Sequence, residues 1–147
     1  MQPLALTLGE PAGIGPDLAL AVWHRRAELA LPRFYVVSDP EFLRRRAARL
    51  RLDVPVSIVT PGAAGAAFSS ALPVVPIDVA VSAEPGHPDR SSAPAAIASI
   101  RRAVADVLAG AALAVVTNPV AKNVLYNSGF AEPGRSEERR VGKECRL

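Results

Sequence analysis

A glycine-rich segment near the start of the chain contains the first residues that could bind a ligand. It follows an apolar run at residues 3–8 and precedes a predicted helix that begins near Pro16. Glycine allows a backbone to approach a ligand closely, and the first turn of a helix presents N–H groups without helical partners. The segment is a candidate loop for an anion or a substrate, and an ordinary strand-to-helix turn explains it equally well. The residues assigned to this loop are Gly9, Glu10, Gly13 and Gly15.

A second polar group follows the apolar run at residues 111–116. Thr117 and Asn118 come directly after that run, and Lys122 lies in the first turn of a helix that Pro119 is expected to open. Ligands of α/β proteins bind beyond the carboxyl ends of the strands, where this group would lie. A lysine at the start of a helix opposes the helix dipole, so we interpret it as a partner for a substrate phosphate. A lysine that is merely solvated is the alternative.

Both groups need a scaffold, and the hydrophobic pattern predicts one in which strands alternate with helices. Such alternation is typical of an α/β layered fold with a largely parallel sheet. Two prolines, Pro73 and Pro76, interrupt one of the predicted strands and indicate that it lies at an edge of the sheet. The apolar runs of strand type are 3–8, 33–38, 54–59, 72–77 and 111–116, the predicted helices are 16–30, 39–50, 95–109 and 119–129, and a loop is expected at Pro61, Gly62 and Gly65.

Composition and charge indicate one globular domain and argue against several classes of partner. Half of the 147 residues are hydrophobic and 21% are charged, which is ordinary for a soluble protein. Residues 1–134 carry 12 Lys and Arg against 11 Asp and Glu, so they lack the basic surplus that a nucleic acid or a membrane would require. The single cysteine, Cys145, excludes a disulfide within the chain, and no signal peptide or membrane-spanning run is visible. We expect a cytoplasmic protein.

Two further groups of residues receive structural interpretations. The arginine-rich stretch at residues 44–51 could contact nucleic acid, but we favour a solvated helix face whose arginine stems cover apolar surface. His24 and His87 have no cysteine, histidine or carboxylate at ligand spacing, so the sequence predicts no metal site.

Two long motifs occur in register: TLGEPAGIGPDLAL at residues 7–20 and AVVTNPVAKNVLYNSGFAEPG at 114–134, with HPDRSSAPAAIASIRRAV at 87–104 between them. Together they resemble the 4-hydroxythreonine-4-phosphate dehydrogenase family of pyridoxal phosphate biosynthesis. The resemblance implies an isocitrate/isopropylmalate dehydrogenase-like fold and a homodimer. It also implies an enzyme that uses NAD or NADP and a divalent metal to oxidise a phosphorylated hydroxy-amino acid, whose product then loses carbon dioxide.

The chain departs from the family pattern after Gly134. Arg135 and Ser136 stand where the family has a His-Thr pair that contacts substrate, and the family's metal-binding histidines lie in a portion that this chain lacks. We therefore expect residues 1–134 to be the N-terminal part of the family domain, which would be inactive by itself. Two alternatives stay open: a fragment of a related decarboxylating dehydrogenase for another acidic hydroxy acid, and a non-catalytic anion-binding α/β module.

The last thirteen residues differ in composition from the rest of the chain. Eight of residues 135–147 are charged, and the only cysteine lies among them. The run RSEERRVGKEC also resembles an in-frame translation of a sequencing-library adapter, so we interpret 135–147 as a non-native or disordered tail. A natural charged tail is the alternative.

Overall fold

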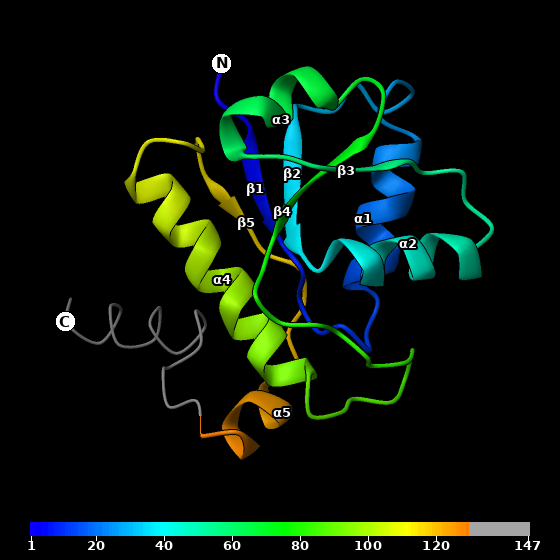
Figure 1. The fold of residues 1–147 in the computed structure, drawn as a ribbon, viewed down its shortest axis with the longest axis vertical. Coiled ribbons are helices and arrows are strands. Elements are labelled where there is room, and N and C mark those ends of the chain that lie inside the picture. Colours follow the sequence, from blue (N-terminus) through cyan, green and yellow to red (C-terminus); the bar gives the residue numbers. More distant parts are fainter. Residues whose placement is uncertain (130–147) are drawn as a thin grey trace, which may run out of the picture.

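A computed structural model describes residues 1–129 as a parallel sheet with helices on both faces (Figure 1). The strands are β1 (Leu4–Thr7), β2 (Phe34–Ser38), β3 (Val56–Ile58), β4 (Leu72–Pro76) and β5 (Val115–Val116). The helices are α1 (Gly15–His24), α2 (Pro40–Arg49), α3 (Pro61–Ala67), α4 (Ser92–Leu108) and α5 (Lys122–Asn127). The strand order is β3-β4-β2-β1-β5, and each neighbouring pair is parallel, so the predicted α/β fold is confirmed. The predicted tail at 135–147 lies outside the described residues.

The central strand β2 shows how the sequence builds two packed layers. All five of its residues are buried, and its side chains alternate between the two faces of the sheet. Phe34 and Val36 pack in the core formed with α1 and α2. Tyr35 and Val37 pack in the second core, which includes residues of α3 and α4. The sequence of a strand that is buried on both faces is a continuous apolar run, as it is at 33–38.

The prediction that the proline-containing strand lies at the sheet edge is wrong, because β4 lies between β3 and β2. Along β4, the N–H groups of even-numbered residues face β3, as at Leu72. Those of odd-numbered residues face β2, as the N–H of Ile77 does just after the strand. Pro73 precedes Val74, the first β4 residue that pairs with β2, and Pro76 follows Val74, the last that pairs with β3. Each missing N–H therefore falls where the neighbouring ladder has not begun or has already ended, and the prolines cost no hydrogen bond.

The predicted loop after residue 59 contains the helix α3, so this expectation is also wrong. Pro61 occupies the first helical position, where its missing N–H has no helical partner to lose. Alanines fill most of the helix, and Ala64 is fully buried against the sheet. The helix-forming tendency of alanine and this burial outweigh the two glycines on which the loop prediction rested.

Other elements are shorter than the hydrophobic pattern suggested. The first helix ends at His24, and Ala30 has a left-handed φ of 49°, so residues 25–30 form turns rather than helix. The last helix begins at Lys122 rather than at Pro119, because the carbonyl of Pro119 accepts a hydrogen bond from Glu10 N–H in another loop.

Candidate functional site

The two predicted binding groups meet at the carboxyl edge of the sheet. Strands β1 and β5 are parallel neighbours, so the segments that follow them leave the sheet side by side (Figure 1). Asn118 Nδ2 donates a hydrogen bond to Thr7 O at 2.9 Å, and Asn118 N–H donates to Thr7 Oγ1 at 3.2 Å. Glu10 N–H donates to Pro119 O at 2.8 Å. The Gly-rich loop (residues 8–15) and the turn that follows β5 (residues 117–121) therefore form one hydrogen-bonded unit.

The glycines of the Gly-rich loop make room for that turn. A Cβ at Gly9 would lie 2.6 Å from Pro119 O and 2.7 Å from Asn118 Cβ, and Gly9 also has a left-handed φ of 71°. A Cβ at Gly15 would lie 2.7 Å from Leu8 O and 3.0 Å from Asn118 Cβ. These distances are too short for any side chain, so the close approach that glycine permits is used by the protein's own backbone.

The polar side chains of the predicted site divide into buried and exposed residues. Glu10 is buried, and its Oε1 accepts a hydrogen bond from Ala12 N–H at 3.0 Å, so the carboxylate closes its own loop. Asn118 is also buried and bonded to β1. Thr117, on the same turn, and Lys122, directly after it, are exposed. Of the residues assigned to substrate, these two are therefore the ones that a ligand can reach.

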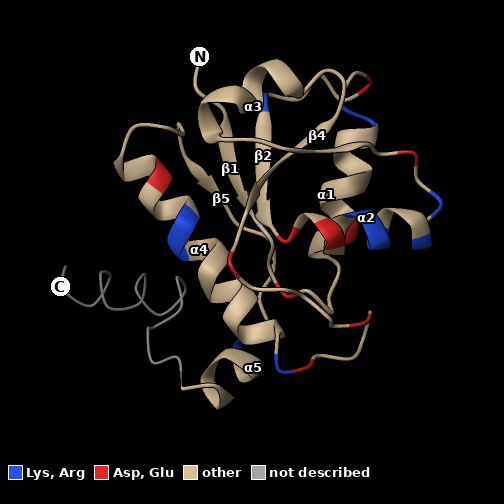
Figure 2. Ribbon diagram, in the orientation of Figure 1, with Lys and Arg blue, Asp and Glu red and all other residues tan. Residues whose placement is uncertain are grey.

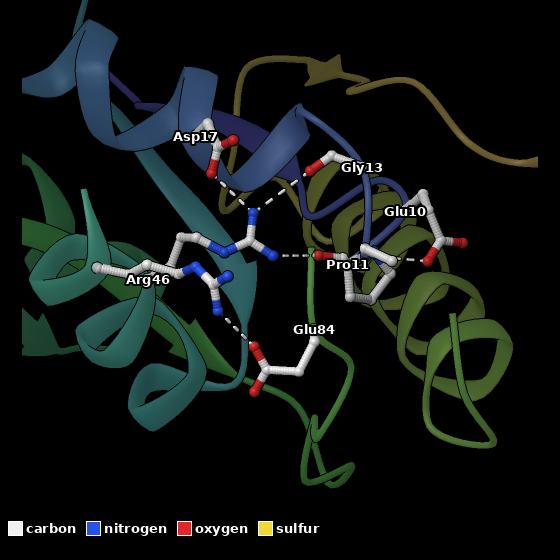
Figure 3. Close-up of polar contacts among 8 residues, drawn as sticks. Glu10, Pro11, Gly13, Asp17, Arg46 and Glu84 are labelled. Atoms are coloured by element: carbon white, nitrogen blue, oxygen red, sulfur yellow. Dashed lines mark hydrogen bonds and ion pairs between the residues drawn. The ribbon is translucent and has the colours of Figure 1, made fainter. Parts of the chain in front are cut away.

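Arg46 is the main residue of this region that the sequence interpretation missed. Its side chain is only 2% exposed, and Nη1 pairs with Asp17 Oδ1 at 2.7 Å (Figure 3). Nη2 donates to Pro11 O at 2.6 Å and Nη1 donates to Gly13 O at 3.3 Å. The guanidinium also lies 5.2 Å from the ring centroid of Phe42. An arginine of the predicted solvated face is thus buried against the Gly-rich loop, and for this residue the interpretation is wrong.

A signal for Arg46 was present in the sequence. The buried residues of α2 include Phe42, Leu43 and Ala47, so position 46 continues their spacing of three and four on the core-facing side.

The exposed arginines of the helix behave as expected, since Arg44 pairs with Glu41. Acidic and basic positions lie close together on α2 and on α4, and Figure 2 shows this interspersed arrangement.

Ser99 on α4 anchors the other side of the carboxyl edge. It is fully buried, its Oγ accepts a hydrogen bond from Leu8 N–H at 2.8 Å and donates one to Val37 O at 2.6 Å. One hydroxyl therefore ties α4 to the ends of β1 and β2. A serine within an otherwise apolar helix stripe gives no sequence signal for such a contact.

The described residues do not fit the divalent metal that the family resemblance implies. Within residues 1–129, no group of three or more His, Cys, Asp or Glu side chains could hold a metal ion. His24 and His87 are both exposed. In the same part of the chain, no helix is both long and apolar enough to cross a bilayer.

An apolar groove of about 320 Å³ lies along β1, between α1 and β5. Its lining contains no charged side chain and includes Leu6, Leu18, Val22, Phe34 and Val116. A phosphate requires charged or N–H donors, so this groove does not suit the phosphorylated end of a substrate.

Comparison with known proteins identifies the family of the chain. The family model described as pyridoxal phosphate biosynthetic protein PdxA matches residues 30–140. The chain belongs to the PdxA family. The 4-hydroxythreonine-4-phosphate dehydrogenase of Bradyrhizobium diazoefficiens is 56% identical over 144 residues, which cover 92% of this chain and 42% of that protein. The protein of the same name from Methylorubrum populi is 54% identical and covers 92% of this chain and 40% of its own length.

A solved structure of a PdxA dehydrogenase has a similar fold. The crystal structure of 4-hydroxythreonine-4-phosphate dehydrogenase from Klebsiella pneumoniae matches with a TM-score of 0.75 and 29% identity, over 93% of this chain and 43% of that one. PdxA dehydrogenases have an isocitrate/isopropylmalate dehydrogenase-like fold, so the predicted fold class is confirmed. The chain spans about two fifths of the length of the PdxA relatives that it matches, which fits the predicted fragment. The substrate roles of Thr117, Asn118 and Lys122 stay predictions.

Proposed function

We propose that the full-length protein containing this sequence is a 4-hydroxythreonine-4-phosphate dehydrogenase of pyridoxal phosphate biosynthesis. The observation that carries the proposal is the 56% identity with the Bradyrhizobium protein of that name, which extends over 92% of this chain. The full-length protein would oxidise 4-hydroxythreonine 4-phosphate with NAD or NADP, after which the product loses carbon dioxide. It would act as a cytoplasmic homodimer, and we assign the divalent metal to the C-terminal portion of the family domain, which this chain lacks.

Within this chain, the proposed substrate contacts come from the turn at residues 117–121 and from the start of α5. Thr117 is an exposed residue with a hydroxyl group, and the exposed Lys122 offers a cation that pairs well with a phosphate group. The buried Asn118 would act on the substrate indirectly, because its side chain holds the turn against β1. The Gly-rich loop supports that turn from the other side.

A hybrid protein tests the proposed activity directly. We define the hybrid as residues 1–134 of this chain joined to the remaining C-terminal part of the Bradyrhizobium relative. It should reduce NAD or NADP when 4-hydroxythreonine 4-phosphate and a divalent metal are supplied, and the 147-residue chain alone should not. Turnover of another acidic hydroxy acid in place of this substrate would favour a related dehydrogenase. A folded hybrid without any dehydrogenase activity would favour the non-catalytic module.

The role of Lys122 is tested by Lys122→Ala in the hybrid. Removal of a charge-assisted contact to phosphate should raise KM by about 10-fold or more, since such contacts are worth about 1.5–3 kcal/mol. Lys122 is exposed at the first position of α5, so the thermal unfolding temperature should stay close to that of the parent. Unchanged KM and kcat would return Lys122 to the solvated alternative.

A further inference from the structure

The buried guanidinium of Arg46 is the polar contact that holds the Gly-rich loop to α2. A charged group that leaves water must be paired and hydrogen-bonded, or its burial is strongly unfavourable. Arg46 meets this requirement through the Asp17 carboxylate and two carbonyls of the loop, Pro11 O and Gly13 O. The three acceptors lie within one short segment, residues 11–17, so a single side chain contacts the passage from loop to helix at three points.

The two carbonyls that Arg46 contacts lie on either side of Ala12, which is also hydrogen-bonded within the loop. Pro11 O and Gly13 O flank Ala12, whose N–H donates to Glu10 Oε1 at 3.0 Å. Gly13 N–H also donates to Glu10 O at 3.0 Å. Gly86 N–H donates to Ala12 O at 2.7 Å. The segment 10–13 is therefore fastened by its own acidic residue, by Gly86 and by Arg46 of α2, whose contacts Figure 3 shows.

The Gly-rich loop contacts the turn at 117–121 directly, so the position of the loop affects the position of Thr117 and Lys122. Glu10 N–H donates to Pro119 O, and Gly9 lies so close to Asn118 that no methyl group fits between them. A shift of the segment 10–13 would therefore move the turn at 117–121, or open the packing between them. Thr117 lies on that turn, and Lys122 follows directly after it.

We propose that Arg46 is a positioning residue for the substrate site, acting through the Gly-rich loop on Thr117 and Lys122. The inference rests on the proposed function, because it takes Thr117 and Lys122 as substrate contacts. Arg46 itself is buried beneath the loop and does not touch substrate.

The first test compares three variants of the hybrid protein. Arg46→Met keeps an unbranched apolar stem beside Phe42 but removes all three polar contacts, and should raise KM for 4-hydroxythreonine 4-phosphate about tenfold while kcat changes less. Arg46→Lys keeps the charge near Asp17 without the planar fork that reaches two carbonyls, so its KM should lie between those of the parent and Arg46→Met. Arg44→Met removes an exposed ion pair from the same helix and should leave KM unchanged.

A double-mutant cycle separates positioning from general stabilisation. If Arg46 acts through the turn, Arg46→Met should raise KM far less in the Lys122→Ala background than in the parent. Hydrogen exchange supplies a readout that does not depend on activity. The amides of Ala12 and Gly13 should exchange faster in Arg46→Met than in Arg44→Met, because the segment 10–13 has lost its contact with α2.

The outcomes distinguish this inference from the proposed function. A lower unfolding temperature in Arg46→Met with unchanged KM, or KM effects that simply add in the double mutant, would overturn the positioning role. Unchanged exchange at Ala12 and Gly13 would overturn it as well. A parent hybrid without turnover would instead contradict the proposed function, and the exchange measurement would still decide whether Arg46 fixes the loop.

Discussion

The packing between the two motifs predicts that one methyl group at Gly9 destabilises the fold. Gly9 has φ +71°, and a Cβ there would lie 2.6 Å from Pro119 O. A left-handed backbone costs an L residue about 1–2 kcal/mol, and a methyl group forced into filled space costs about 1–3 kcal/mol. The nearest atom belongs to the backbone, so no rotamer change can relieve the contact. Gly9→Ala should therefore lower the free energy of unfolding by about 2–5 kcal/mol.

Three other glycines separate backbone strain from crowding. Gly86 has φ +78° and nothing within 4 Å of an added Cβ, so Gly86→Ala should cost about 1–2 kcal/mol through strain alone. Gly15 has no left-handed φ, but its Cβ would lie 2.7 Å from Leu8 O, so Gly15→Ala should cost about 1–3 kcal/mol through crowding alone. Gly62 lies in α3 with open space around it, and Gly62→Ala should stabilise the fold by about 0.4–1 kcal/mol.

The single tryptophan of the chain provides the assay. Trp23 is 2% exposed and its Nε1 donates to Phe68 O at 3.0 Å, so its fluorescence should change when the core opens. Urea unfolding of the 147-residue chain gives the midpoint and the slope for each variant, and an unchanged slope licenses comparison of the free energies. The expected order of stability is Gly62→Ala, then the parent, then Gly86→Ala and Gly15→Ala, and last Gly9→Ala.

Two results would refute this reasoning. If Gly9→Ala is no less stable than Gly86→Ala, the loop does not pack on the turn at 117–121 as closely as the structure shows. If Gly9→Ala unfolds like the parent but raises KM in the hybrid, Gly9 serves the approach of a ligand, which is the role that the sequence first suggested.

Two further predictions concern α4 and its contacts with the sheet. Ser99→Ala leaves two buried backbone groups, Leu8 N–H and Val37 O, without their partner. In urea unfolding it should lower the free energy of unfolding by about 1–3 kcal/mol. Ser70→Ala, at an exposed serine, should have little effect, and equal effects of the two substitutions would contradict the anchoring role of Ser99. Burial, followed by the hydrogen bond that its hydroxyl donates to Asp106, raises the pKa of Tyr35 well above its ordinary value of 10.0. The neutral phenol therefore stabilises the fold fully below about pH 10, and this contribution is lost as the pH rises towards the folded pKa. Unfolding temperatures measured from about pH 9 to about pH 11 should fall less steeply for Tyr35→Phe than for the parent, and equal slopes would refute the assignment.

The periodicity of apolar residues was sufficient to predict the layered α/β fold. Five runs of strand type and four helical stretches were assigned, and each corresponds to an element of the structure. The errors arose where local rules depend on a neighbour that the sequence does not specify. Pro73 and Pro76 exclude a strand interior only if the ladder that each missing N–H faces reaches that proline. In β4, the pairing with β2 begins after Pro73, at Val74, and the pairing with β3 ends before Pro76, also at Val74. The lengths of β3 and β2, rather than the prolines, decide where β4 can lie.

The candidate site was predictable in its location but not in the roles of its residues. The rule that ligands bind beyond the carboxyl ends of parallel strands placed the group at residues 117–122 at that edge of the sheet, and the pairing of β1 with β5 brings the Gly-rich loop beside it. The sequence allowed two interpretations of Gly9, a ligand loop or an ordinary turn. The structure supplies a third, which is close packing against the turn at 117–121. Its nearest contact is Pro119, which is distant along the chain and adjacent only once β1 and β5 have paired.

Arg46 shows the same dependence on tertiary structure from the opposite direction. A run of arginines on one helix is usually solvated, and the charges of Arg44 and Arg49 are exposed. Arg46 differs because its position follows the core-facing stripe of α2, so its guanidinium must find acceptors beneath the Gly-rich loop. The loop supplies them because its glycine-rich path leaves carbonyls without helical or strand partners on that side. The motif residues and Arg46 therefore depend on one another: the loop satisfies a buried charge, and the buried charge holds the loop in the shape that packs against the turn at 117–121.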